Sequence, residues 1–419
     1  MWIENTVMYQ IYPIGFCGAP KVNKGEEGHH FGEIESIIPH LIDLGVNSVM
    51  LNPVLYSVAH GYDTTDFVKI DNRLGTADEF KALIKAFHDS GIKVVYDGVF
   101  NHVGRDFPQF KDVIANKRNS RYLDWFYIDF NGNTRYNDGF GYKDWQNCPE
   151  LVKLHLENDE VQDLIFSAVK YWITEYDIDG IRLDAANLLP KWFFKKLKSV
   201  CTELKPDFPL IGEHIRIHEF VDCVGEGLLD SLTNYECYTG MTSSVNQPNF
   251  FEIAHSIERI LARGGMFFGK HLLSFLDNHD VTRAASAIKN PQNLKVAYAL
   301  MYALPGFPCL YYGSEYGVKG DKKWGDYELR PAWRDIDKSN TELIPVLKAL
   351  AEIRKNPDAV YGEYKKLYLD NTAYAFCRGN IVYAFNVGSA EKIIREGGRE
   401  IKIAPHGFTV ICGDQTLAF

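Results

Sequence analysis

The sequence lacks the features of membrane-spanning and exported proteins. No apolar run approaches the roughly 20 residues that a helix needs to cross a bilayer. The first residues, MWIENTVMYQIYPIGF, carry an early acidic residue and no basic region followed by an apolar core. We therefore expect a cytoplasmic protein without a signal peptide and without a membrane partner.

The cysteines form neither a metal-binding pattern nor a recognisable disulfide framework. None of the eight belongs to a CxxC pair, and their spacing is scattered: Cys17, Cys148, Cys201, Cys223, Cys237, Cys309, Cys377 and Cys412. Scattered cysteines without an export signal favour reduced thiols in a cytoplasmic protein.

An excess of positive charge is also missing. The net charge of −10 at pH 7 argues against a nucleic-acid partner and against an anionic membrane surface. With 46% hydrophobic and 24% charged residues, the composition is that of a soluble globular protein. The 419 residues suffice for one large domain with small additions, and they leave the oligomeric state open.

Strand-like and helix-like segments alternate through most of the chain. Eight apolar strands are predicted at 7–13, 46–54, 93–100, 180–185, 209–213, 231–236, 271–278 and 308–313. Helices are predicted after them at 31–45, 77–91, 157–176, 190–204, 217–227, 249–263, 291–303 and 341–355. Eight such units favour an α/β fold, a parallel (β/α)₈ TIM barrel, over an open doubly wound sheet. No Gly-rich phosphate-binding motif follows the first strand.

Two segments depart from this alternation. The polar, aromatic stretch after the third strand is too long for an ordinary loop and predicts a small inserted domain at 103–156. Short alternating runs from about residue 358 predict an antiparallel β domain at 358–419. The barrel is then expected to comprise residues 1–102 and 157–357.

Polar residues gather at the C-terminal ends of the predicted strands, where a barrel of this kind builds its active site. They are Asp97, Asn101, His102, Arg182, Asp184, Glu213, His279 and Asp280. Arg182 and Asp184 are two residues apart and point to the same side of their strand. Taken alone, this pair is equally consistent with an internal salt bridge, and Asp97 is better explained as a partner of Arg182 than as a catalyst. The whole set favours an active site, because barrel-plugging residues are normally branched and aliphatic.

These strand ends resemble the four signature stretches of the α-amylase family of glycoside hydrolases. The matching stretches are DGVFNH (97–102), GIRLDAAN (180–187), GE (212–213) and FLDNHD (275–280). Auxiliary motifs of the family resemble GVNSVMLNPV, HGYDTTDF (60–67), GFPCLYYG (306–313) and VKLHLENDEV (152–161), the last with His155 where the family usually has Asn. The resemblance covers nearly the whole chain, and four short motifs on matching strands make it specific.

The resemblance implies a retaining hydrolase of α-1,4-glucosidic linkages in maltooligosaccharides and other α-glucans. Asp184 matches the nucleophile, Glu213 the general acid/base and Asp280 the third carboxylate, which grips sugar hydroxyls and steadies the transition state. Arg182 beside the nucleophile is expected to keep that carboxylate ionised.

Further residues match substrate-binding positions of the family. His102 and His279 match hydroxyl-binding histidines, and Tyr62 matches the aromatic platform under the sugar ring, with a loop-anchoring core tyrosine as the alternative. Asp63 and Arg330 are candidates for a pair that closes the non-reducing end of the cleft, or for solvated loop charges.

No cofactor is required by this chemistry, and calcium stays possible. Asn101 corresponds to a calcium ligand in many relatives, although an Asn here also suits a loop hydrogen bond. The sequence contains no DxDxDG-type calcium loop near its N-terminus, so no metal ligand is assigned.

Two departures bear on the substrate. Asn187 and Leu188 replace the Lys-His pair of many starch-degrading relatives, which puts their mode of polymer binding in doubt here. In the insertion, Phe140, Tyr142 and Trp145 are candidates either for stacking on distal sugars or for ordinary packing.

Two other functions remain open. A glucanotransferase or isomerase uses the same covalent intermediate with water excluded, and the sequence does not separate it from a hydrolase. A sugar-binding barrel without catalysis is expected to have lost carboxylates, whereas all three are present here. Endo or exo action and the preference for α-1,4 or α-1,6 linkages also remain open.

Overall fold

The computed structural model describes residues 1–396 and 398–419, and its centre is a ring of eight parallel strands. The strands follow one another around the ring in chain order: β1 (Met8–Ile11), β2 (Ser48–Leu51), β3 (Lys93–Gly98), β9 (Gly180–Leu183), β10 (Leu210–Gly212), β11 (Ser231–Leu232), β12 (Leu273–Ser274) and β13 (Phe307–Tyr311). A parallel bridge between Thr233 and Leu273 closes the ring between β11 and β12. The predicted (β/α)₈ barrel is confirmed.

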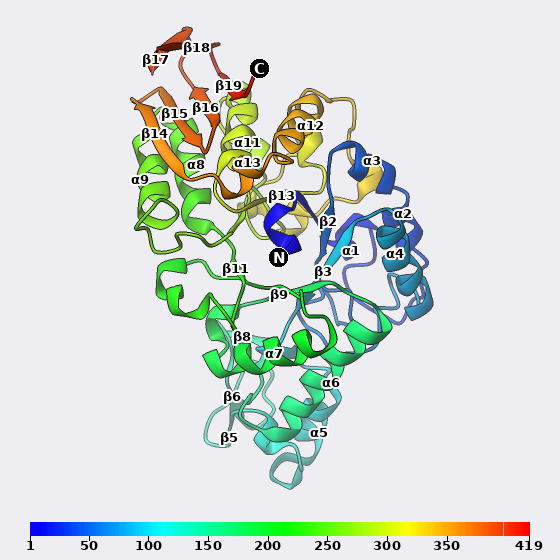
Figure 1. Ribbon diagram of the computed structural model, residues 1–419. Helices are drawn as coiled ribbons and strands as arrows, with labels where there is room; N and C mark the ends of the chain where they lie inside the picture. The colour runs from blue at the N-terminus through cyan, green and yellow to red at the C-terminus, as the bar shows by residue number, and fades with distance from the viewer. Residues whose placement is uncertain (397) are drawn as a thin grey trace.

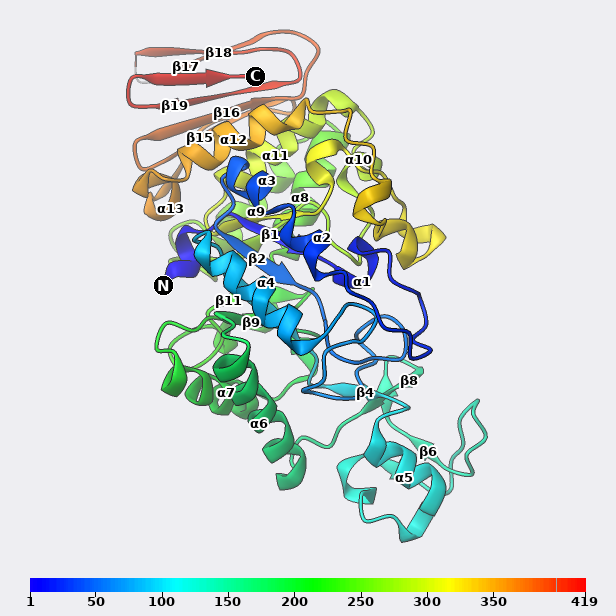
Figure 2. The same ribbon diagram turned by 90° about the vertical axis from the view of Figure 1, so that its right-hand side faces the viewer.

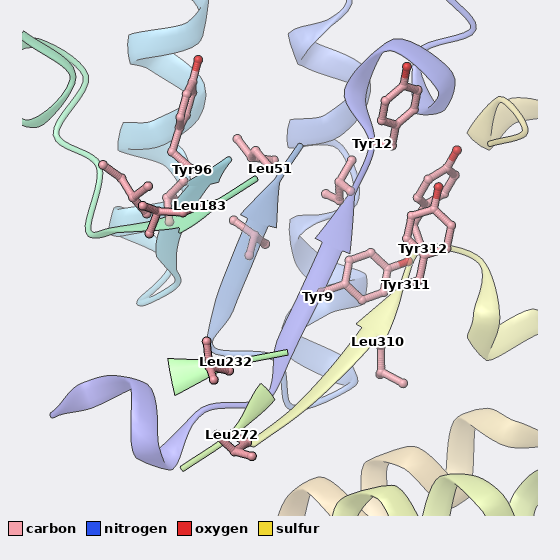
Figure 3. Close-up of a cluster of buried hydrophobic side chains, with 14 of the residues drawn as sticks. Tyr9, Tyr12, Leu51, Tyr96, Leu183, Leu232, Leu272, Leu310, Tyr311 and Tyr312 are labelled. Carbon is pink, nitrogen blue, oxygen red and sulfur yellow. The ribbon is translucent and has the colours of Figure 1, made fainter. Parts of the chain in front are cut away.

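The strands are buried on both sides, which explains their continuous apolar sequence. One alternate set of side chains fills the inside of the barrel, including Met8, Met50, Val95 and Ile211. The other set packs outward against the helices and belongs to the main core. Figure 3 shows part of that core, with Tyr9, Leu51 and Tyr96 on three neighbouring strands.

Helices surround the strands on the outside. They are α2 (Phe31–Glu35), α3 (Ile38–Asp43), α4 (Ala77–Asp89), α6 (Asp159–Glu175), α7 (Lys191–Leu204), α8 (Tyr235–Asn246), α9 (Phe251–Ile260), α11 (Leu294–Ala303) and α12 (Leu343–Ile353). The N-terminus of α4 is set by a capping box, in which Thr76 and Glu79 satisfy each other's backbone N–H groups. Among the described residues, no helix combines the length and the apolar character needed to cross a membrane.

Several predicted elements differ from the structure, and the strand predicted at 271–278 is reduced to β12 (Leu273–Ser274). The segment 217–227 forms only the 3₁₀ turns η5 (Ile217–Glu219) and η6 (Val221–Cys223), and Gly225 and Gly227 with positive φ end the regular backbone there. The strand predicted at 231–236 stops at Leu232, because the Asn234 side chain caps α8. The helix predicted at 31–45 is divided into α2 and α3.

Two smaller parts extend the barrel at opposite ends of the molecule (Figures 1 and 2). One lies between β3 and α6 and contains β4 (His102–Gly104), α5 (Pro108–Asn116), β5 (Ile128–Asp129), β6 (Gly141–Tyr142), β7 (Asp144–Trp145) and β8 (Cys148–Lys153). The other follows α13 (Pro357–Tyr361) and consists of β14 (Tyr364–Leu369), β15 (Ala373–Arg378), β16 (Ile381–Asn386), β17 (Lys392–Glu396), β18 (Arg399–Ile403), β19 (Gly407–Cys412) and β20 (Gln415–Ala418). All pairings within the second part are antiparallel, as the sequence pattern predicts.

Candidate active site

A layer of polar side chains crosses five neighbouring strands just above the apolar interior of the barrel. A side chain two residues after an inward-facing apolar residue on the same strand also points inward, because side chains alternate between the two faces of a strand. Each member of the layer either holds such a position or lies opposite one on the neighbouring strand. The Gln10 amide donates to Asn52 Oδ1 at 2.8 Å, and Asn52 Nδ2 donates to Asp97 Oδ2 at 2.9 Å. Asp97 in turn accepts from Arg182 at 2.6 Å, and Arg182 reaches Glu213 at 2.9 Å. The layer therefore links β1, β2, β3, β9 and the end of β10.

Arg182 is the hub of this layer. The register of β3 and β9 sets it directly opposite Asp97. Its Nη1 contacts Asp97 Oδ1 at 2.6 Å and Asp184 Oδ1 at 3.3 Å, while its Nη2 contacts Glu213 Oε2 at 2.9 Å. Burial alone would lower the pKa of Arg182, but Asp97 and Glu213 outweigh it and raise the pKa well above its usual value. One fixed cation thus holds three carboxylates around it.

The backbone after Asp184 gives Glu213 a second donor. The Ala185 N–H donates to Glu213 Oε2 at 3.0 Å, and this is the same oxygen that contacts Arg182. Ala185 has φ 44°, in the left-handed region, which costs an alanine about 1–2 kcal/mol. Glu213 Oε2 thus has two partners, the Ala185 N–H through a hydrogen bond and the Arg182 guanidinium through an ion pair.

The surroundings of Asp184 disfavour its ionised form. Burial and the Glu213 carboxylate raise the pKa of Asp184 well above its usual range, against the opposing charge of Arg182. The expectation that Arg182 keeps Asp184 ionised is contradicted by this shift, because burial and Glu213 outweigh the charge of Arg182.

Asp280 has the opposite character. Burial alone would raise its pKa, but His279 and Arg330 outweigh that effect and hold the pKa well below its usual range. Asp280 Oδ2 contacts His279 Nε2 at 2.9 Å, and Oδ1 accepts from Arg330 at 3.0 Å. Asp280 is therefore a firmly ionised carboxylate, in contrast to Asp184.

Tyr62 is anchored and also lines the cavity. Its hydroxyl donates to Asp97 Oδ2 at 2.9 Å and lies 2.5 Å from His279 Nε2. The rings of Tyr62 and His279 are stacked, with centroids 5.4 Å apart and planes at 7°. The hydroxyl is thus tied into the core and the residue lines the cavity, while its role as a platform under the sugar ring stays a prediction.

A cavity of about 270 Å³ brings the three acids together at the end of the barrel. It is lined by His60, Tyr62, His102, Trp145, Cys148, Glu150, Leu151, Asp184, Glu213, Asp280, Asp326 and Arg330. Burial lowers the pKa of His102 to about 3, so this histidine presents a neutral ring to the cavity. A larger cavity of about 470 Å³ lies among Tyr56, Tyr171 and Tyr176, but none of the three acids lines it.

A second cavity of about 420 Å³ meets the first at Glu213 and Trp145. Asn187, His214, Ile215 and other residues line it. His214 Nδ1 accepts the Arg216 N–H at 3.3 Å, whereas its buried Nε2 has no partner within the described part of the chain. The buried Trp145 Nε1 is also without a partner there. With respect to the described residues, both ring nitrogens are thus unsatisfied polar atoms buried within residues that line this cavity.

The pair predicted between Asp63 and Arg330 is not formed. Asp63 accepts the His60 N–H at 3.0 Å, whereas Arg330 is held by Asp280 and by Asp326 at 3.3 Å. The predicted pair does not form because two other carboxylates already contact the Arg330 guanidinium. Arg330 lines the catalytic cavity and Asp63 does not.

The candidate aromatic residues of the insertion differ in whether they line a cavity. Trp145 lines both cavities. Phe140 is fully buried and packs against Phe110 and Phe130, so packing is its role. Tyr142 packs on Phe110 at 4.9 Å and is tied to Arg105, away from the lining residues.

The residues around Asn101 do not fit a calcium site. Its buried Oδ1 lacks a partner among the described residues, but calcium takes six to eight oxygen ligands. In residues 1–396 and 398–419, no group of three or more His, Cys, Asp and Glu side chains is arranged to hold a metal ion. A single amide oxygen does not make such a site.

Sequence reasoning missed several residues of this site. Gln10 and Asn52 follow the inward residues Met8 and Met50 by two positions, so the strand period was the signal that identifies them. Cys148, Glu150 and Leu151 come from the insertion, whose sequence carries no comparable periodicity.

Comparison with known proteins assigns the family. A family model described as the catalytic domain of alpha amylase matches residues 10–359. The chain is 30% identical to an intracellular maltogenic amylase of Bacillus subtilis over 423 residues, covering 93% of this chain and 69% of that protein. It is also 30% identical to a cyclomaltodextrinase of Thermoanaerobacter pseudethanolicus, with coverages of 94% and 72%.

Solved structures agree with this assignment. A cyclomaltodextrinase superposes with a TM-score of 0.84 at 26% identity, covering 95% of this chain and 72% of that one. A cyclic alpha-maltosyl-(1→6)-maltose hydrolase from Arthrobacter globiformis superposes over 100% of this chain with a TM-score of 0.87, and at 23% identity it supports the fold alone. The chain therefore belongs to the α-amylase family and is a retaining glycoside hydrolase that cleaves α-1,4-glucosidic linkages.

Proposed function

We propose that Asp184 is the nucleophile, Glu213 the general acid/base and Asp280 the carboxylate that binds the reacting sugar. The observation that carries this proposal is the arrangement around Arg182, which contacts both Asp184 and Glu213 beside a cavity that all three acids line. Retaining hydrolysis needs one ionised and one protonated carboxyl group close together. Asp184 and Glu213 both contact the Arg182 guanidinium, so this proximity is present.

In the first step the Asp184 carboxylate attacks the anomeric carbon, and the bond to the leaving-group oxygen breaks. Glu213 Oε1 gives its proton to that oxygen, while Oε2 stays bound to Arg182 and to the Ala185 N–H. In the second step Glu213 takes a proton from water, and the hydroxide replaces Asp184 at the anomeric carbon. Two inversions retain the α configuration.

The charge of Asp280 suits a binding role. Arg330 and His279 hold it ionised, so it accepts hydrogen bonds from sugar hydroxyls instead of exchanging protons. These hydrogen bonds strengthen as the ring flattens and gains positive charge, and that difference lowers the barrier. Tyr62 then borders the ring of the same sugar.

The second cavity suits the leaving group. Because Glu213 protonates the departing oxygen, the sugar beyond that oxygen lies on the far side of Glu213 from Asp280. Trp145, Asn187 and His214 line this cavity and therefore border that sugar.

We propose soluble maltooligosaccharides inside the cell as the substrates. Relatives named as an intracellular maltogenic amylase and as cyclomaltodextrinases support this class of substrate. The eight cysteines are all free thiols, which agrees with a reducing cytoplasm. Titration of eight thiols in protein unfolded without reductant is the expected result, and fewer than eight would contradict the location.

We also propose that the chain consists of a catalytic barrel (1–102 and 157–357), an insertion (103–156) that forms part of the cavity wall, and a C-terminal β domain (358–419). It needs no metal ion, because all proposed steps use side chains of this chain. Dialysis against EDTA should leave kcat and Tm unchanged, and a loss restored by calcium would overturn this part.

Transfer to a sugar acceptor is the alternative to hydrolysis, since the second cavity is able to hold an acceptor in place of water. With maltoheptaose as substrate, hydrolysis gives only shorter products, whereas transfer also gives chains longer than seven units. We propose hydrolysis as the main reaction, and longer chains as the dominant early product would contradict it.

Three substitutions test the assignment of the acids. Asp184→Asn and Glu213→Gln should each lower kcat by about a thousandfold or more, while Asp280→Asn should lower it by at least about a hundredfold. All three should keep their circular dichroism spectra, because the side chains border a solvent-filled cavity. Near-normal activity of any one of them would refute its role.

A further inference from the structure

The loop between β13 and α12 presents two aromatic side chains to solvent. Trp324 is 73% exposed and Tyr327 is 43% exposed. They belong to two consecutive 3₁₀ turns, η9 (Lys322–Trp324) and η10 (Asp326–Leu329), joined by Gly325 with φ 99°. Figure 2 shows this loop in yellow and gold on the same side of the molecule as the insertion in cyan. Most of the Trp324 side chain is thus accessible to a ligand.

The loop is fixed to the segment that carries Asp280. Thr282 accepts the Lys322 N–H at 3.2 Å, and the Arg283 N–H donates to the Gly320 carbonyl at 3.0 Å. The Asp321 side chain caps η9 by accepting the Lys323 N–H at 3.1 Å. These bonds hold Trp324 in place before any ligand binds, which reduces the entropy lost on binding.

The loop continues directly into the wall of the catalytic cavity. Asp326, two residues after Trp324, lines that cavity, and so does Arg330. Lys322 contacts Asp326, and Arg330 contacts both Asp326 and Asp280. Neither Asp326 nor Arg330 lines the second cavity beyond Glu213. Trp324 therefore belongs to the loop that forms the wall of the catalytic cavity at Asp326 and Arg330, which is not the wall shared with the second cavity.

The two rings differ in the faces that they offer. The Lys21 ammonium lies 4.0 Å from the centre of the Tyr327 ring and covers one face. Trp324 has only the Lys323 ammonium, 5.3 Å from its ring, and that lysine is itself exposed. The broad indole surface is thus the larger free aromatic face beside the cavity. Such a face binds the C–H side of a glucose ring, while the hydroxyls at the ring edge stay in water.

We propose that Trp324 is a stacking platform for glucose units on the non-reducing side of a long α-glucan, beyond the unit that Asp184 attacks. This rests on the proposed orientation of the substrate across Glu213. The platform adds binding energy only for chains that extend past the catalytic cavity. It therefore makes the protein favour longer maltooligosaccharides over short ones through KM, and it leaves the chemical step unchanged.

The test compares Trp324→Ala, Trp324→Phe and the unmodified protein on maltotriose and maltoheptaose. Trp324→Ala should raise KM for maltoheptaose about three- to tenfold, the scale of one aromatic stacking contact. Its kcat, and both constants for maltotriose, should stay within about twofold. Trp324→Phe should recover most of the loss. Tyr361→Ala removes another exposed aromatic, on α13, and should change neither substrate.

Three outcomes would overturn the proposal. Unchanged KM for maltoheptaose in Trp324→Ala would exclude stacking there. An equal loss for both substrates would mean that the residue acts through the catalytic cavity. A lower mass of Trp324→Ala by light scattering, without a change in chain-length preference, would identify a subunit contact. If all variants still hydrolyse maltotriose, the proposed function holds whether or not Trp324 binds longer chains.

Discussion

Arg182 and Asp97 face each other across neighbouring strands with their charged atoms 2.6 Å apart, and both are buried. The same guanidinium contacts Asp184 and Glu213. A lysine keeps the charge but cannot reach three carboxylates with a planar fork. We therefore expect Arg182→Lys to lower kcat at least about a hundredfold, measured by reducing-sugar release from maltoheptaose.

Arg73 supplies the matched control. It is equally buried and pairs with Asp71 at 2.6 Å, outside the catalytic cavity. Arg73→Lys should lower Tm as Arg182→Lys does, because both leave a buried carboxylate poorly paired. It should keep kcat within about threefold in the folded protein. Equal losses of kcat in the two variants would reduce Arg182 to a structural residue.

The pH profile should depend on the coupling between Asp184 and Glu213. Glu213 raises the pKa of Asp184, so the acidic limb of kcat/KM should lie above the ordinary range of an aspartate. Activity should be lost as the pH falls through that pKa, since a protonated Asp184 is not a nucleophile. Glu213→Gln removes the neighbouring charge, which should move the acidic limb to lower pH and abolish the basic limb.

This shift is measured with α-maltosyl fluoride, because fluoride departs without a proton and the variant stays active enough to assay. Asp280→Asn is the comparison. It removes a more distant charge that raises the pKa of Asp184 less than Glu213 does. An acidic limb that stays in place in Glu213→Gln would show that the two acids are not coupled.

Asp184→Asn should make the fold more stable at neutral pH. The folded protein raises the pKa of Asp184, so the protonated carboxyl group stabilises the fold. This stabilisation is fully present below the ordinary pKa of an aspartate and is lost as the pH rises through the pKa that Asp184 has in the folded protein. The asparagine side chain does not ionise, so the variant does not lose this stability as the pH rises. Thermal unfolding should give a higher Tm for the variant at pH 7, and the gain should shrink as the pH falls toward 4.

Asp71→Asn should behave in the opposite way, since it removes the partner of the buried Arg73. Its Tm should fall at pH 7. An Asp184→Asn variant that is less stable than the unmodified protein at pH 7 would mean that Arg182 stabilises this carboxylate more than burial and Glu213 disfavour it.

Substrate length should favour soluble oligosaccharides. The cavity is small, the Lys-His pair of many polymer-degrading relatives is Asn187-Leu188, and Asn187 lines the leaving-group cavity. We expect kcat/KM for maltohexaose or maltoheptaose to exceed that for soluble starch per accessible linkage, with maltose and glucose among the end products. Rapid loss of iodine staining before small sugars appear would instead indicate an endo-acting polymer hydrolase.

The barrel was predictable because each strand is buried on both sides and reads as an apolar run. The same periodicity brings Asp97, Arg182 and Glu213 together, so the polar centre of the site follows from local sequence. Helix α8 was missed because its sequence, YECYTGMTSSVN, is rich in polar and small residues. Its start depends on the Asn234 cap.

The walls of the site depend on tertiary contacts instead. Trp145 and Cys148 reach the cavity from short strands of the insertion, whose sequence has no period that indicates a facing direction. Arg330 pairs with Asp280 and not with Asp63 because of the position of its loop, and sequence spacing does not predict that position. Sequence thus predicts the acids better than the residues that surround them.

Trapping the glycosyl-enzyme tests the central assignment most directly. An α-glucosyl fluoride with a second fluorine at C5 carries a good leaving group and destabilises the oxocarbenium-like state, so an intermediate forms and persists. Peptide mass spectrometry should find one hexosyl adduct per chain on the peptide that contains Asp184, and none in Asp184→Asn. An adduct on another residue, or no adduct together with a β-configured first product by NMR, would contradict Asp184 as the nucleophile.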